Sequence, residues 1–192
     1  LTYSFGSSSG TIATGVGTSY SWTPALSLAN QIPNASSGTG TITCKTYNGN
    51  TLIGTKSCTF TAALPASYKP SFTSLTTTRV DNGVPSSWGI YVQTKSKCTL
   101  AITGAAGIYG STIKSYSITG GGYSSTSSSF TTGTLNTSGT ITFTATITDS
   151  RGRTASKTAS ISVVAYSPPQ ISSCSAQRCN SSGTVVDDGT YI

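Results

Sequence analysis

Apolar and hydroxyl-bearing residues alternate along residues 140–164, the segment TITFTATITDSRGRTASKTASISVV. A period of two is typical of β-strands that bury one face. Residues 150–152 interrupt the alternation and can form a three-residue hairpin loop, because Gly152 tolerates a positive φ. With that loop, Asp149 faces Arg153, and Lys157 faces Ala145 as the one misfit, which we expect at an edge or rim. The apolar pairs are Ile147 with Ala155, Phe143 with Ala159, and Ile141 with Ile161.

Shorter alternating runs and frequent turn signals predict an all-β protein built from tandem β-sandwich modules. In the first module, residues 1–65, LTYSF predicts a strand and residues 39–62 a hairpin closed by Asn48-Gly49-Asn50. Residues 25–31 have a helix-compatible composition that Pro33 ends, so we expect at most one short helical turn. This module is small and we treat it as incomplete on its own.

The second module, residues 66–165, contains about seven short alternating runs separated by turn signals, the spacing of an immunoglobulin-like sandwich. One predicted strand places Trp88, Ile90 and Val92 on a common face, with Trp88 buried. No cysteine pair links the predicted sheets. The pattern therefore favours a disulfide-free module of the Ig-like or fibronectin-III-like kind.

Residues 166–192 repeat the beginning of the second module. Tyr, Pro, Arg, Gly and Tyr recur in the same order, offset by one or two positions, so we expect the start of a further, truncated repeat. The chain begins without Met and ends on Tyr191-Ile192 within a strand-like run, which we interpret as part of a longer polypeptide.

The chain has few charged residues, and basic residues outnumber acidic ones. Lys and Arg number 11 against four Asp and Glu, which gives a formal net charge of +7. The cations are scattered singly rather than as the basic stripe with aromatics that nucleic acids usually require. Two pairs come closest to a cluster, and we take them as candidate surface-contact residues: Lys95, Lys97, Arg151 and Arg153.

Arginines at a hairpin tip can clamp a carboxylate, a phosphate or a partner subunit. The simpler interpretation, which we favour, is that Asp149 and Arg153 pair across the turn and keep it soluble.

The five cysteines make a poor disulfide framework because their number is odd and their spacing irregular. In the hairpin with a three-residue loop, Cys44 faces Gly54 and Cys58 faces Gly40. The two sulfurs then lie roughly 13 Å apart along the strands, beyond disulfide reach. We therefore expect reduced thiols and assembly in a reducing cytoplasm.

The residue inventory also excludes most catalytic chemistry. The chain has no His, which removes the Ser-His and Cys-His nucleophile systems. Its carboxylates are Asp81, Asp149, Asp187 and Asp188, and turns explain them better than a cleft or a calcium loop. Cys174 and Cys179 are too isolated for a zinc site. We expect no catalytic, cofactor-binding or metal residues, and we expect that the protein is not an enzyme.

Three segments together resemble minor structural proteins of long-tailed phages or prophages of Gram-positive bacteria. They are GTGTITCKTYNGNTLIG, the ITDSRGRTA hairpin and the Tyr-x-Pro-Pro restart. Proteins of that kind carry tandem Ig-like modules in tail or neck appendages and fibres.

The resemblance implies a non-enzymatic virion protein that serves as a spacer and in host-surface adhesion, after assembly in the host cytoplasm. The implied partners are other virion proteins, copies of the chain itself and host cell-wall glycopolymer, with no specific nucleic acid and no membrane span. The alternative is a bacterial cell-surface adhesin built from stacked Ig-like domains.

Overall fold

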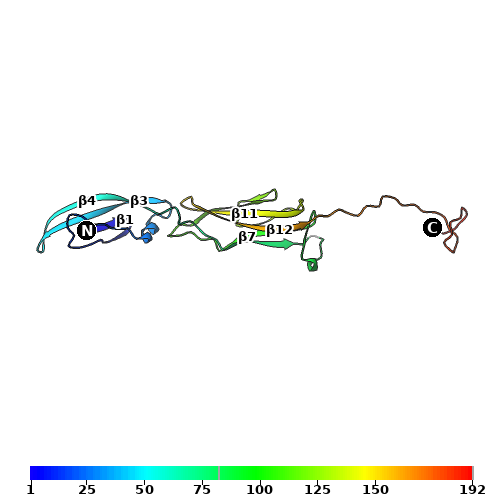
Figure 1. Ribbon diagram of the computed structural model, residues 1–192, viewed down its shortest axis with the longest axis horizontal. Helices are drawn as coiled ribbons and strands as arrows, with labels where there is room; N and C mark the ends of the chain where they lie inside the picture. The colour runs from blue at the N-terminus through cyan, green and yellow to red at the C-terminus, as the bar shows by residue number, and fades with distance from the viewer. Residues whose placement is uncertain (82, 192) are drawn as a thin grey trace.

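The computed structural model describes residues 1–81 and 83–191, and it is all-β as the sequence predicts. Figure 1 shows an elongated molecule in which two β-rich regions follow one another along the long axis. A thin, extended C-terminal segment leaves the second region and ends in a small loop cluster.

The first region is a single antiparallel sheet with strand order β2-β1-β3-β4. Its strands are β1 (Thr2–Phe5), β2 (Ser8–Thr11), β3 (Ser37–Asn48) and β4 (Thr51–Ala63). The helical turn expected at residues 25–31 is present as the 3-10 helix η1 (Leu26–Gln31). The sheet and η1 bury Phe5, Leu28, Ala29 and Leu64. Trp22 packs between Tyr3 and Phe60, with ring centroids 5.1 Å and 5.3 Å away, and closes this small core.

The expected register of the β3–β4 hairpin was wrong. The strands are joined by the two-residue turn Gly49-Asn50, and a bulge between Thr46 and Tyr47 leaves one extra residue in β4. Cys44 therefore faces Lys56, and Cys58 faces Ile42. The shorter turn and the bulge each shift the pairing by one residue, and the combined shift of two leaves every side chain on its expected face. The two cysteines therefore keep a common face but lie closer along the strands than expected.

All five cysteines are free in the structure. Cys58 and Cys174 are exposed, whereas Cys98 is fully buried and its thiol lies 3.6 Å from the Tyr91 hydroxyl. Burial raises the pKa of the Cys98 thiol, which disfavours the reactive thiolate.

We expect a thiol reagent to label Cys58 and Cys174 quickly in the folded protein and Cys98 only after unfolding. Intact-mass measurement without reductant should show five labels on the unfolded chain. A chain that accepts only three labels would contain a disulfide and would contradict the expectation of reduced thiols.

The second region consists of two sheets, with strand orders β10-β7-β5 and β6-β12-β11-β8-β9. Every pairing is antiparallel except that between β6 and β12. The strands are β5 (Ser74–Val80), β6 (Tyr91–Val92), β7 (Lys97–Thr103), β8 (Ile113–Gly120), β9 (Tyr123–Ser125), β10 (Ser129–Thr131), β11 (Gly139–Asp149) and β12 (Thr154–Val164).

The β11–β12 hairpin has the register predicted from the sequence. Ile147 pairs with Ala155, Phe143 with Ala159 and Ile141 with Ile161. Lys157, the one misfit, is exposed at the sheet edge, where its amine donates to the Thr73 carbonyl and lies 5.5 Å from the centre of the Phe72 ring.

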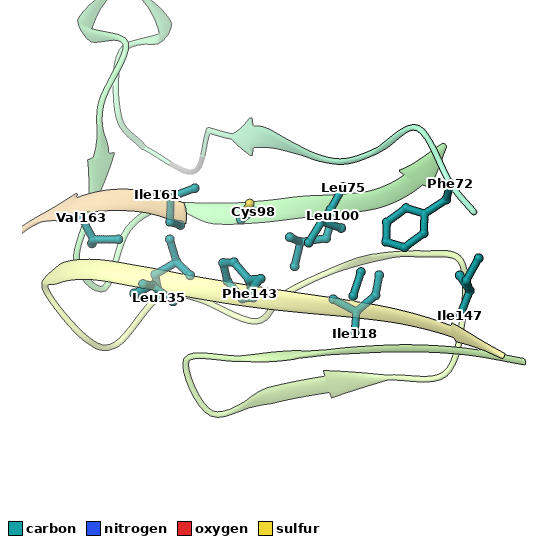
Figure 2. Packing of buried hydrophobic residues seen from close by; sticks show 12 residues of the cluster. Phe72, Leu75, Cys98, Leu100, Ile118, Leu135, Phe143, Ile147, Ile161 and Val163 are labelled. Carbon is teal, nitrogen blue, oxygen red and sulfur yellow. The ribbon is translucent and has the colours of Figure 1, made fainter. Parts of the chain in front are cut away.

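The apolar face of this hairpin forms the main core of the molecule. Figure 2 shows Phe143 and Ile118 on one side, with Leu100, Cys98 and Leu75 opposite them. Phe143, Leu100, Ile118 and Ile147 are fully buried. The two sheets of the second region are therefore the layers of one sandwich.

The expected strand through Trp88 was wrong. Residues Ser86–Trp88 form a second 3-10 turn, η2, and the strand that follows is limited to Tyr91–Val92. Gly89 ends the turn with φ +65°, and the Trp88 side chain is 61% exposed instead of buried.

Residues 166–191 lie outside the sandwich core. Their only pairings in the described part of the chain are bridges of Cys179 with Val185 and with Tyr191. Ile171 is 88% exposed. That these residues begin a further repeat stays a prediction.

Candidate functional site: the arginine loop between the two regions

The loop at residues 150–153, called the arginine loop below, connects β11 to β12 at the end of the sandwich that faces the first region. Asp149, which is fully buried, fixes this loop. Its Oδ1 accepts hydrogen bonds from the backbone N–H groups of Arg151 (3.0 Å) and Arg153 (2.8 Å). Gly152 adopts φ +81° in the same turn. A short polar side chain that caps its own turn in this way is typical of Asx turns.

The Arg151 side chain reaches across to the first region. Its Nη2 donates to the Ala29 carbonyl (2.8 Å), and its Nε donates to the carbonyls of Ile32 (3.2 Å) and Ala35 (3.1 Å). These carbonyls belong to η1 and the residues just after it. A cation is favourable there because the carbonyl end of a helix carries partial negative charge.

The same guanidinium also holds a loop of its own region. Nη1 donates to the Ile108 carbonyl (2.6 Å) and Nη2 to the Tyr109 carbonyl (2.5 Å). Tyr109 has φ +48°, which a residue other than glycine adopts only at a cost, so surrounding contacts must stabilise it. The Tyr109 ring packs edge-on against Tyr68, with 5.5 Å between centroids.

Arg153 holds the connection between the two regions. Its guanidinium donates to the carbonyls of Leu64 (2.5 Å), Pro65 (2.9 Å) and Tyr68 (2.6 Å). The Ser150 hydroxyl adds a bond of 2.6 Å to the Pro33 carbonyl. The loop thus bonds both to the end of η1 and to the linker that follows β4.

The ion pair expected between Asp149 and Arg153 is absent from the described residues, in which the one salt bridge joins Arg79 to Asp81. The Asp149 carboxylate is occupied by backbone N–H groups, and its Oδ2 is buried without a hydrogen-bond partner. The Arg153 guanidinium instead points to linker carbonyls. Burial lowers the pKa of the Arg151 guanidinium, although arginine stays protonated in proteins.

Lys95 and Lys97, the other two candidate contact residues, lie at the opposite end of the sandwich. Lys97 begins β7, and the Lys95 amine lies 5.3 Å from the centre of the Tyr166 ring, next to the exit of β12. The structure therefore divides the four candidates between two ends and does not bring them into one patch.

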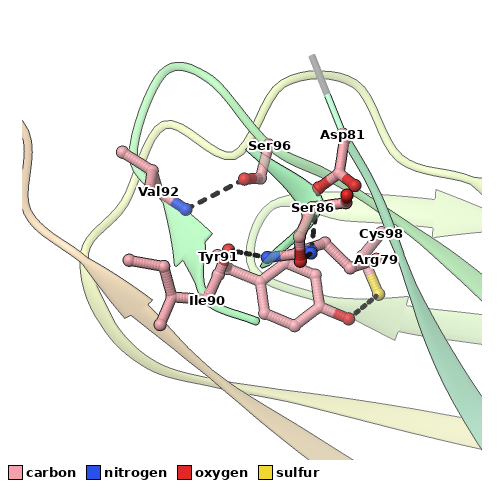
Figure 3. A network of polar contacts seen from close by, with 8 residues as sticks. All are labelled: Arg79, Asp81, Ser86, Ile90, Tyr91, Val92, Ser96 and Cys98. Carbon is pink, nitrogen blue, oxygen red and sulfur yellow. Dashed lines mark hydrogen bonds and ion pairs between the residues drawn. The ribbon is translucent and has the colours of Figure 1, made fainter. Parts of the chain in front are cut away.

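A third carbonyl-binding arginine, Arg79, forms a separate site that was not recognised from the sequence. Figure 3 shows its guanidinium between the η2 turn and Asp81. It donates to the carbonyls of Ser86 and Ile90, each at 2.7 Å, and its Nε lies 2.9 Å from Asp81 Oδ1. The sequence feature that could have indicated this site is the spacing of Arg79 and Asp81, two residues apart and just before a predicted turn.

Neither arginine site has the parts of a catalytic centre. The acceptors are main-chain carbonyls and one paired carboxylate, so the chemistry available there is binding and positioning. Among residues 1–81 and 83–191, no three Cys or Asp side chains gather as metal ligands. In that same part of the chain, neither 3-10 helix is long and apolar enough to span a membrane.

The sequence matches a protein family over residues 1–187, and that family is described as a siphovirus protein of unknown function (DUF859). The chain belongs to this siphovirus family. Comparison with the curated proteins gives no match. Of the two origins considered from the sequence, the family match supports the phage rather than the bacterial cell surface. The junction just described is thus part of a siphovirus protein.

Proposed function

We propose that this siphovirus protein is a non-enzymatic structural component of the virion, a spacer in a tail or neck appendage or fibre. The observation that carries the proposal is the arginine loop, which ties one β-region to the next. Eight hydrogen bonds from Arg151 and Arg153 reach carbonyls on the first region, the linker and the neighbouring loop. Hydrogen bonds from charged donors are stronger than neutral ones, and a planar guanidinium offers five N–H groups in fixed directions.

A spacer must hold its two ends at a fixed distance and orientation, so it needs a rigid junction between its regions. Domains joined by a short linker move relative to one another unless their interface resists it. Here the linker between the regions includes residues 64–68, and three of its carbonyls, those of Leu64, Pro65 and Tyr68, accept hydrogen bonds from the Arg153 guanidinium. The elongated arrangement in Figure 1 is what such a joint would maintain.

Presence in the particle is the direct test of this function. Antibodies raised against the second region should label purified virions at a tail or neck structure in immunogold electron microscopy. Virions from a phage that lacks the gene provide the control. Purified particles without label, from a lysate that contains the free protein, would contradict the proposal.

The protein also contacts the host surface in this proposal, through its charge and not through a shaped pocket. A net charge of +7 with four carboxylates attracts anionic polymers such as the phosphate-rich glycopolymers of Gram-positive walls. Isolated cations in water bind weakly and are screened over about 8 Å at physiological salt, so many copies must act together. Because Arg151 and Arg153 have intramolecular partners, exposed lysines are the main contributors: Lys45, Lys56, Lys69 and Lys114.

Retention on purified cell walls tests the adhesion. We expect retention that falls with salt, falls on walls stripped of teichoic acid, and falls again when these four lysines are replaced by glutamine. Retention indifferent to salt and to teichoic acid would mean that the charge has no role in adhesion, and the protein would then be a spacer alone.

A further inference from the structure

The outer edge of β4 is the longest open sheet edge in the described part of the chain. Other edge strands are short: β2 has four residues, β9 and β10 have three, and β6 has two. β5 has seven, and it lies next to β12 of the facing sheet. β4 has 13 residues, and only β3 pairs with it. Natural proteins usually keep open edges short or guarded, so a long one marks a place where another strand can add.

β4 carries few of the features that prevent strand addition. It has no proline, and Lys56 is its one charged residue. All its residues except Phe60 and Ala62 are exposed. By comparison, the open part of β12 carries Lys157, which folds over its own edge onto Phe72. Leu52 and Ile53, which are 48% and 64% exposed, add apolar surface to the β4 edge.

The chemistry of β4 matches that of the strands with which this chain pairs internally. Hydroxyl groups bond across strands in all three sheets, for example Thr43 with Ser57 (2.9 Å), Thr99 with Thr131 (2.7 Å) and Thr146 with Ser156 (2.7 Å). Thr55, Thr59 and Thr61 continue the Ser57 row along one face of β4. A partner strand with a similar hydroxyl row would extend the ladder.

We propose that β4 pairs with β4 of a second copy of this chain, antiparallel about a two-fold axis near Ser57 and Cys58. An isologous contact of this kind needs a self-complementary surface. With the axis at Ser57, Lys56 faces Cys58 of the second copy, and with the axis at Cys58 it faces Phe60. Neither register places Lys56 opposite itself, and in both registers Thr55 and Thr59 face Ser or Thr. An edge with one charge in 13 residues has little to select an acidic or a basic partner, which favours the chain itself.

The experiment measures the mass of the purified chain by light scattering over a micromolar concentration series. The test variant is Thr55→Lys with Thr59→Lys. It places lysines of the two copies directly opposite each other when the axis lies at Ser57, and diagonally across the strands when it lies at Cys58. Like charges across neighbouring strands destabilise their pairing. The matched control is Thr154→Lys with Thr158→Lys. It makes the same change of charge at the same spacing, on exposed hydroxyl positions of β12.

We expect a concentration-dependent dimer for the wild type and the β12 variant, and an increase of about tenfold or more in the dimer dissociation constant for the β4 variant. A wild type that stays monomeric throughout, or a β4 variant that dimerises as well as the wild type, would overturn the proposal. Equal weakening in both variants would do the same, because it would attribute the effect to net charge.

Cys58 provides an independent readout near the proposed axis. In a Cys174→Ser background, a short bismaleimide should join two chains through Cys58, as peptide mapping would show. The cross-link should be lost in the β4 variant and kept in the β12 variant. Cross-linking that is unchanged in the β4 variant would contradict the pairing. The surface is separate from the carbonyl-bound arginine loop, so failure here leaves the proposed function untouched.

Discussion

Replacing Phe143 with alanine is expected to unfold the second region under conditions in which the wild type is folded. The Phe143 side chain is fully buried at the centre of the sandwich, between the two sheets. Phe-to-Ala substitutions in cores cost about 3–5 kcal/mol, because transfer energy is lost and a cavity remains. That is a large part of the roughly 5–15 kcal/mol that stabilises a typical domain.

Urea denaturation followed by circular dichroism measures this loss. Thr140→Ala is the matched control, since Thr140 lies on the exposed face of the same strand, and it should change the stability by less than about 1 kcal/mol. A similar loss of unfolding free energy in both variants would mean that the face of β11 that carries Phe143 is not the face that packs in the core.

The second large effect is expected from replacing both Arg151 and Arg153 with alanine. The two side chains supply the guanidinium bonds between the regions, and hydrogen bonds to charged groups contribute about 1.5–3 kcal/mol each. Once the junction opens, water forms hydrogen bonds with the freed carbonyls and offsets part of this energy. We therefore expect the double variant to lose about 2–3 kcal/mol of the free energy that couples the two regions. The two regions should then unfold in separate transitions in calorimetry.

Two control variants make this result specific. Arg151→Lys with Arg153→Lys keeps the charge but loses the planar fork, and it should restore little of the coupling. Lys95→Ala with Lys97→Ala removes the same number of charges at the far end of the sandwich and should leave the coupling unchanged. Full rescue by lysine would mean that charge alone holds the junction.

The register of one hairpin could be predicted from the sequence, whereas that of the other could not, and the difference has a physical reason. In the β11–β12 hairpin only one loop length brings Ile141 opposite Ile161 and keeps hydroxyls outside, so the pattern determines the register. In the β3–β4 hairpin, one face is a row of Thr and Ser along most of its length, so a shift of two positions keeps every side chain on its own face and still pairs hydroxyl with hydroxyl. The bulge at Thr46 and the turn at Gly49-Asn50 therefore could not be read from the alternation.

Trp88 shows how a tertiary contact overrides a local pattern. The alternation of Trp88, Ile90 and Val92 predicts a strand, but Arg79 takes the carbonyls of Ser86 and Ile90, which favours a turn there. Carbonyls leave no signature in a sequence, because every residue has one. For the same reason the arginines of the β11–β12 loop were recognised as a clamp candidate, whereas their acceptors, up to 122 positions earlier, were not.

Two regions held by the arginine loop must tumble as one body. Residual dipolar couplings of backbone amides, measured on the wild-type chain in a dilute aligning medium, test this most directly. Couplings from residues 1–65 and from residues 66–165 should fit one alignment tensor with the orientation seen in the structure. Tensors of clearly different magnitude for the two sets would show that the regions move independently, and would contradict a rigid junction.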